Sequence, residues 1–94
     1  MGARQYGGKT MNGKRLLEQS ISTIEERQKV YGSPKENFEH IAKRWSLLLG
    51  ITVTPAQVGL MMLDLKIARL QKNPGHYDSL VDVAGYAACL SDLR

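Results

Sequence analysis

The sequence lacks several features that would each point to a particular class of protein. A single cysteine, Cys89, cannot form a disulfide within the chain, and its apolar neighbours Ala88 and Leu90 predict a buried thiol. No apolar run approaches the roughly 20 residues that a membrane-spanning helix needs. The basic N-terminus is not followed by an apolar stretch, so no secretory signal is expected. These absences favour the cytoplasm and argue against a membrane partner.

Acidic residues are missing from the first fifteen positions. The chain has 13 Lys and Arg against 9 Asp and Glu, and its net charge of +4 lies in residues 1–15, because the remainder is neutral. A protein that coats nucleic acid carries basic charge along a whole face, so nucleic acid is not the expected partner. The glycine-rich residues 1–13 predict a flexible basic arm, which is either a disordered, solubilising tail or a segment that contacts phosphate. Residues 14–94 suffice for one domain.

Apolar residues recur at helical spacing in four segments, which predict helices over residues 14–30, 34–49, 55–72 and 79–92. Ser33-Pro34-Lys35-Glu36 and Thr54-Pro55-Ala56-Gln57 each have the pattern of a capping box, with proline at the first helical position. Asn73-Pro74-Gly75 ends the third helix, and Asp78 or Ser79 is expected to cap the fourth.

The apolar positions also predict which faces form the core. They are Leu17, Ile21 and Ile24; Phe38, Ile41, Ala42, Trp45, Leu48 and Leu49; Val58, Met61, Met62, Leu65 and Ala68; and Leu80, Val83, Ala84, Ala87 and Ala88. No segment alternates with the period of a strand, so we predict an all-α fold, a small antiparallel bundle of about four helices. The methionines of the third helix and the small residues of the fourth favour a homo-oligomer, although packing within one chain would explain them equally well.

The densest group of polar residues surrounds the turn between the third and fourth predicted helices. It consists of Lys66, Arg69, His76, Asp78, Ser79, Asp82 and Tyr86. In an antiparallel hairpin these residues meet near one end, where cations would bind phosphate, polar groups sugar or base, and the ring would stack. The start of the fourth helix adds N–H groups suited to an anion. The structural alternative is that Lys66 or Arg69 pairs with Asp78 or Asp82 and ties the hairpin together.

Two residues outside the hairpin extend this candidate site. Asn37 follows the first capping box and neighbours Phe38, so its amide could point into a pocket. Tyr31 precedes Gly32 and is expected to be half-buried at the helix junction, where its ring could stack on a base.

A metal-dependent enzyme is a further alternative. Glu36 with Glu39, and Asp78 with Asp82, supply carboxylate pairs that could hold Mg²⁺ with nucleotide phosphates. All-α pyrophosphohydrolases use a Glu-Glu-x-x-Glu stretch followed by Glu-x-x-Asp on the next helix, and this sequence departs from that pattern. The two histidines lack the close spacing of metal ligands. No cofactor is therefore expected, and Mg²⁺ enters only under this alternative.

Several short motifs stand out between residues 25 and 90. They are Tyr31-Gly-Ser-Pro-Lys-Glu-Asn-Phe38, Trp45 with Leu49-Gly50, Thr54-Pro55, Leu60-Met-Met62, Leu65-Lys-Ile-Ala-Arg-Leu70, Asn73-Pro74, His76, Asp78-Ser79 and Val81-Asp82-x-Ala-Gly-Tyr-Ala87. Together they resemble a family of small proteins encoded by tailed phages and prophages. The resemblance implies a viral origin and a host-cytoplasm setting, but no particular reaction. The family's shared polar positions correspond here to Asn37, Lys66, Arg69, His76, Asp78, Ser79, Asp82 and Tyr86. An acid often stands in the family where this chain has Gln57, which further weakens a metal role.

Several unrelated helical phage proteins act by sequestering nucleotide signals of bacterial immunity, usually as symmetric oligomers. By analogy, we expect a non-catalytic, oligomeric binder of a nucleotide or cyclic nucleotide. In this hypothesis Lys66 and Arg69 bind phosphate, polar side chains bind sugar or base, and Tyr86 or Tyr31 stacks; the polar side chains are Asn37, Asp78, Ser79 and Asp82. The alternatives are a Mg²⁺-dependent pyrophosphohydrolase-like enzyme and a protein-interaction inhibitor of a host complex.

Overall fold

The structure, a computed structural model, describes residues 12–93, so most of the predicted basic arm lies outside the described residues. It contains four helices, α1 (Gly13–Tyr31), α2 (Pro34–Leu49), α3 (Pro55–Lys72) and α4 (Tyr77–Ser91). No strand occurs within the described range, which confirms the all-α prediction. We also find that no described helix combines the length and apolar character needed to cross a membrane.

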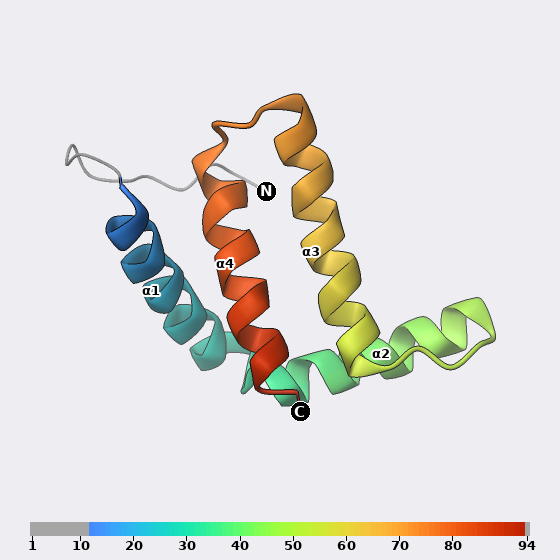
Figure 1. Cartoon of the computed structure of the whole chain (residues 1–94). Helices are drawn as coiled ribbons and strands as arrows, with labels where there is room; N and C mark the ends of the chain where they lie inside the picture. Colours follow the sequence, from blue (N-terminus) through green and yellow to red (C-terminus); the bar gives the residue numbers. More distant parts are fainter. Residues whose placement is uncertain (1–11, 94) are drawn as a thin grey trace.

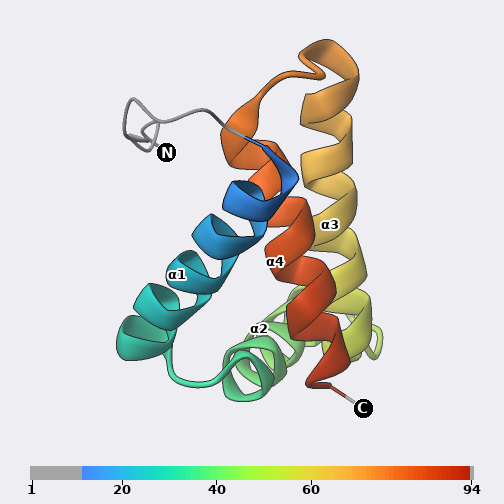
Figure 2. The same cartoon turned by 60° about the vertical axis from the view of Figure 1, so that its left-hand side comes forward.

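Helix α4 lies between α1 and α3, and α2 crosses one end of this layer (Figures 1 and 2). The predicted antiparallel arrangement is correct for the α3–α4 hairpin. It is wrong for α1 and α4, which run in the same direction, and for α2, which crosses the other helices. This topology arises because α2 carries the chain across the width of the layer, from α1 to α3, and α4 then fills the space between them.

The caps of α2 and α3 explain why their predicted boundaries are accurate. At α3 the capping box is complete, because Thr54 Oγ1 accepts from the Gln57 N–H at 3.1 Å and Gln57 Oε1 accepts from the Thr54 N–H at 2.9 Å. At α2, Ser33 Oγ accepts from the Glu36 N–H at 3.1 Å. A complete capping box would also have the Glu36 carboxylate accept from the Ser33 backbone N–H. Here the carboxylate accepts from the Ser33 hydroxyl instead, at 3.0 Å.

The cap of α4 differs from the prediction. The capping residue is His76, and neither Asp78 nor Ser79 takes this position, so the helix begins at Tyr77. His76 Nδ1 accepts from the Ser79 N–H at 3.3 Å and lies 2.7 Å from Ser79 Oγ. Sequence rules for helix starts favour Ser, Thr, Asp and Asn, and therefore overlook a ring nitrogen that accepts the same bond.

Replacing His76 by alanine should lower the free energy of unfolding by about 1 kcal/mol, because the Ser79 N–H then lacks its capping acceptor. His76→Asn is the matched control, since asparagine caps helices well and should preserve most of the stability. Urea unfolding followed by far-ultraviolet circular dichroism measures both variants. An equal loss in the two would contradict a capping role for the ring.

The apolar core lies where α2, α3 and α4 meet. Phe38 and Ala42 of α2, Val53 of the α2–α3 connection and Val58 of α3 are buried together. Partly buried side chains surround this cluster: Ile41, Trp45, Met62, Tyr86, Cys89 and Leu93. The predicted stripe on α2 does not continue to the end of the helix, because Leu48 is 81% exposed and Leu49 is also exposed.

The buried face of α1 is polar, contrary to the prediction. Leu17 is 58% exposed and Ile21 is similarly exposed, whereas Ser20 and Thr23 are buried. The Ser20 hydroxyl donates a buried hydrogen bond of 2.9 Å to the Val81 carbonyl oxygen of α4. The Thr23 hydroxyl instead donates to the Gln19 carbonyl oxygen within α1.

The buried face of α3 is also displaced from its predicted position. Val58 is fully buried as expected, and Met62 is partly buried, but Met61 and Leu65 are exposed. Gly59 and Lys66 occupy the buried face instead. On α4, the predicted Ala87 and Ala88 are exposed, and Ser79, Val81 and Asp82 are buried.

Candidate functional site

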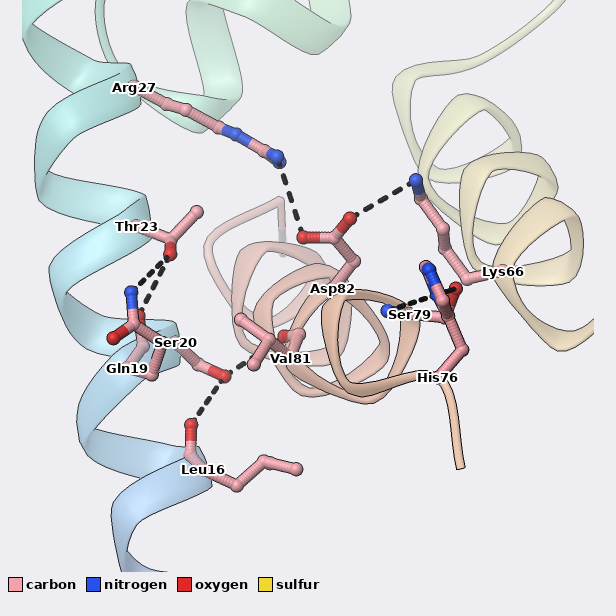
Figure 3. Close-up of polar contacts among 10 residues, drawn as sticks. All are labelled: Leu16, Gln19, Ser20, Thr23, Arg27, Lys66, His76, Ser79, Val81 and Asp82. Atoms are coloured by element: carbon pink, nitrogen blue, oxygen red, sulfur yellow. Dashed lines mark hydrogen bonds and ion pairs between the residues drawn. The ribbon is translucent and has the colours of Figure 1, made fainter. Parts of the chain in front are cut away.

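Three helices bring three charged side chains together (Figure 3). Asp82 of α4 lies between Lys66 of α3 and Arg27 of α1. Its Oδ2 is 3.1 Å from Lys66 Nζ, and its Oδ1 is 3.4 Å from Arg27 Nη2. The Lys66 and Asp82 side chains are 3% and 4% exposed, whereas that of Arg27 is 42% exposed.

The Lys66–Asp82 pair is one of the ion pairs that the sequence offered as the structural alternative. An ionised group this deeply buried is tolerated when an opposite charge and hydrogen bonds compensate for the lost hydration. Since the pair joins α3 to α4, it ties the hairpin together as that alternative proposed. Arg27 adds a second cation from the more exposed side of the same carboxylate.

A cavity of about 340 Å³ lies between α1, α2 and α4, beside this charged group. Its walls are mainly apolar and include Phe38, Ile41 and Met62. Arg27 and Asp82 also line it, so the cavity combines an apolar interior with a charged wall. Small-molecule sites in proteins have this character, since a few polar groups orient a ligand that apolar side chains surround.

Aromatic rings form part of the cavity. The rings of Phe38 and Tyr86 lie 6.3 Å apart, centroid to centroid, at an angle of 32°. Burial raises the pKa of Tyr86, an effect that exceeds the lowering caused by the nearby Arg27 guanidinium. The Tyr86 hydroxyl is therefore protonated at neutral pH. Tyr31 also lines the cavity but is 61% exposed, which corrects the expectation that it is half-buried.

Cys89 lines the cavity as well and is only partly buried. Burial raises the pKa of its thiol, and the negative charge of Asp92 raises it further. Because the thiolate is the nucleophilic form of cysteine, these effects keep Cys89 in its less reactive state.

The structure separates the predicted site residues into two groups. The cavity is lined by Tyr31, Asn37, Asp82 and Tyr86. Lys66 is not part of the lining, but it forms an ion pair with Asp82, which is. The others lie outside the cavity lining: Arg69 is exposed on α3, and His76, Asp78 and Ser79 lie at the beginning of α4. In the described part of the chain, the second group therefore contributes nothing to the lining of this cavity.

Sequence reasoning missed Arg27, the cation that lines the cavity. Ser20, Thr23 and Arg27 nevertheless recur at intervals of three and four residues, so they share one face of α1. That polar stripe is the signal that could have identified α1 as a helix packed on a polar partner.

Within residues 12–93, no three His, Cys, Asp or Glu side chains are grouped so that they could hold a metal ion. Glu36, one of the carboxylates considered for Mg²⁺, accepts a hydrogen bond from the Ser33 hydroxyl.

The sequence of the chain matches a known protein family. Residues 15–94 match the family described as "Domain of unknown function (DUF6378)". The chain belongs to this family. It is 44% identical over 80 residues to the "Gene 55 protein" of Mycobacterium phage L5, an alignment that covers 79% of this chain and 51% of that protein.

A second relative is the "Gene 55 protein" of Mycobacterium phage D29, with 41% identity over 79 residues, covering 83% of this chain and 52% of that protein. The chain thus spans about half the length of the curated relatives it matches. No solved structure matches it. These relatives confirm the resemblance to a family of phage proteins.

Proposed function

We propose that this phage protein binds a phosphorylated nucleotide without converting it, with the base in the cavity and the phosphate at Arg27. The observation that carries this proposal is a mainly apolar cavity that contains a guanidinium and the ring of Tyr86. Guanidinium groups bind phosphate oxygens in a bidentate manner, and aromatic rings stack on bases. Tyr86, Asn37 and Asp82 keep the roles that the sequence hypothesis gave them. Arg27 replaces Lys66 and Arg69 as the residue that binds the phosphate.

The size of the cavity limits the ligand. A volume of about 340 Å³ is near the lower end of the range for small-molecule sites, which extends from about 300 to 1,000 Å³. A single base with its sugar is compatible with this volume. A dinucleotide would need space outside the cavity or in a second copy of the chain.

The chemistry of the cavity favours binding over catalysis. Both carboxylate oxygens of Asp82 are engaged in ion pairs, one with Lys66 and the other with Arg27. The raised pKa values of Tyr86 and Cys89 keep both groups protonated. A protein of this kind would act in the host cytoplasm by sequestering a nucleotide, such as a signal of host immunity.

Replacing Arg27 by glutamine should weaken nucleotide binding at least tenfold, because the phosphate then loses its charged partner. The matched control is Arg44→Gln, which removes an exposed arginine of α2 that lies outside the cavity. Isothermal titration calorimetry with a panel of linear and cyclic nucleotides measures both variants, and thermal unfolding shows whether they fold.

Chromatography of the bound nucleotide, with and without Mg²⁺, distinguishes binding from catalysis. Recovery of intact nucleotide is the expected result. Cleavage that depends on Mg²⁺ would establish the enzyme alternative, and an absence of nucleotide binding would overturn the proposal.

Exposed apolar residues favour a second candidate function in protein association. Leu47, Leu48 and Ile51 are exposed, and the C-terminal end of α2 extends beyond α3 (Figure 1). Several exposed apolar side chains at one end of a helix are typical of surfaces that bind another protein. We propose a homo-oligomer formed through this end of α2, with a host protein as the alternative partner.

Leu48→Gln should convert such an oligomer to a monomer, because it places an amide where the partner presents apolar groups. Light scattering coupled to size-exclusion chromatography measures the mass, with Glu39→Gln on the same helix as the control. A monomeric unmodified chain would exclude the homo-oligomer, and a host protein that binds through Leu48 would then support the inhibitor alternative.

A further inference from the structure

We infer that the cavity selects a ligand with one negative charge, as in a phosphodiester, and that Lys66 is the buried counter-charge that leaves Arg27 able to bind it. This inference rests on the proposed nucleotide-binding function and specifies its ligand class. It follows from how Arg27, Lys66 and Asp82 share their charges.

The three side chains carry a net charge of +1, from two cations and one carboxylate. Asp82 is closer to Lys66 than to Arg27, at 3.1 Å against 3.4 Å, and the Lys66 side chain is 3% exposed against 42% for Arg27. Because electrostatic attraction increases as distance and hydration decrease, Lys66 compensates for most of the Asp82 charge. The positive charge that remains is therefore located on Arg27.

Arg27 lies where a ligand can reach this charge. Among the described residues that line the cavity it is the one Lys or Arg, since Lys66 lies behind Asp82 and outside the lining. Its guanidinium contacts Asp82 through Nη2 and also interacts with Tyr86. A guanidinium has five N–H donors in a planar fork, so these contacts leave donors for an oxygen pair of a ligand.

The apolar walls make the number of ligand charges important. A terminal phosphate carries a charge of about −1.5 to −2 at neutral pH, whereas a phosphodiester carries one negative charge. One charge is balanced by the net +1 of Arg27, Lys66 and Asp82. A second charge would find no counter-charge among the described lining residues, and on its cavity side it would lie against mainly apolar walls, where burying a charge is unfavourable.

The first test compares ligands on the unmodified full chain by isothermal titration calorimetry. The probes are three forms of each common nucleoside: the 3′,5′-cyclic monophosphate, the 5′-monophosphate, and the methyl ester of the 5′-monophosphate. The ester has the open sugar of the 5′-monophosphate but one charge, so it separates charge from shape. We expect the cyclic form, the ester or both to bind at least tenfold more tightly than the 5′-monophosphate of the same nucleoside.

Equal or tighter binding of the 5′-monophosphate would overturn the inference and leave the proposed function intact. Failure of every probe to bind would overturn both. The two failures are therefore distinguishable in one experiment.

The second test changes the charge of the site. Lys66→Met removes the buried cation, so Asp82 should neutralise Arg27 and binding of the singly charged probes should weaken at least tenfold. Lys72→Met, an exposed lysine on the same helix, is the matched control. Retained affinity in a folded Lys66→Met variant would overturn the role of Lys66.

Asp82→Asn raises the site charge to +2 and should shift the preference about tenfold toward the 5′-monophosphate. Such a reversal of selectivity is not expected from a residue that only supports the fold. An unchanged preference in the folded variant would overturn the charge-matching inference, and the ligand comparison on the unmodified chain decides the matter if this variant does not fold.

Discussion

Replacing Asp82 by alanine should lower the free energy of unfolding by about 3–5 kcal/mol, the cost of leaving a buried charge without its partner. Lys66 is 3% exposed and lies 3.1 Å from the Asp82 carboxylate. In the variant its ammonium group would be buried without that counter-charge, while Arg27 remains partly in water. For a chain of 94 residues this loss is a large part of the total stability.

Chemical denaturation measures this effect, and Asp64→Ala is the matched control because Asp64 is an exposed carboxylate on α3. The double variant Asp82→Leu with Lys66→Met should recover much of the stability, since an apolar pair can replace a buried ion pair at little cost. The prediction would be contradicted if Asp82→Ala were no more destabilising than Asp64→Ala.

Gly59→Val should lower the free energy of unfolding by about 1–3 kcal/mol, because it overpacks the contact between α3 and α4. A Cβ atom at Gly59 would lie 2.7 Å from Leu90 Cδ2 and 3.3 Å from Phe38 Cε2. Valine adds two further methyl groups at this buried position. The loss of a helical glycine offsets only part of the strain.

Gly13→Val is the matched control for this prediction, since a Cβ atom at Gly13 meets nothing within 4 Å. Combining Gly59→Val with Leu90→Ala should restore part of the stability if contact with the leucine causes the strain. Thermal unfolding of the four proteins, including the unmodified chain, measures both effects. Equal stability of the two glycine variants would show that the interface between the helices relaxes without cost.

The sequence predicts the number and boundaries of the helices well because their signals are local. Thr54 and Gln57 satisfy each other across a single turn, and Gly32 ends α1 with a φ of 80° that glycine adopts readily. His76 shows the limit of these rules. Its ring performs the function of a capping carboxylate or hydroxyl, and the chain there becomes helical two residues earlier than predicted.

The buried faces were harder to predict because hydrophobicity alone does not select them. On α1 the apolar residues Leu17 and Ile21 are exposed, whereas the Ser20 hydroxyl bonds to the α4 backbone. On α3, Lys66 is buried because Asp82 lies opposite. Which side of a helix is buried thus depends on the helix that packs against it. The spacing of apolar residues along one helix does not reveal this.

The grouping of the candidate site residues also depends on which helices pack together. Asp82 and Tyr86 could be selected because they are one helical turn apart in a polar region. Their grouping with Arg27 depends on α1 and α4 running side by side, which the sequence pattern did not indicate. Arg69 follows Lys66 by three residues on α3, but it is exposed and lies outside the cavity lining.

The central position of α4 has a consequence for the order of folding. Ser20 and Val81 are 61 positions apart, so the contact between their helices closes a long loop of chain. The α3–α4 hairpin closes a much shorter loop, and α1 lacks its main partner until α4 has been synthesised. We therefore expect the hairpin to form first and α1 to join last, so that the cavity and its Arg27 wall are completed in the final step of folding.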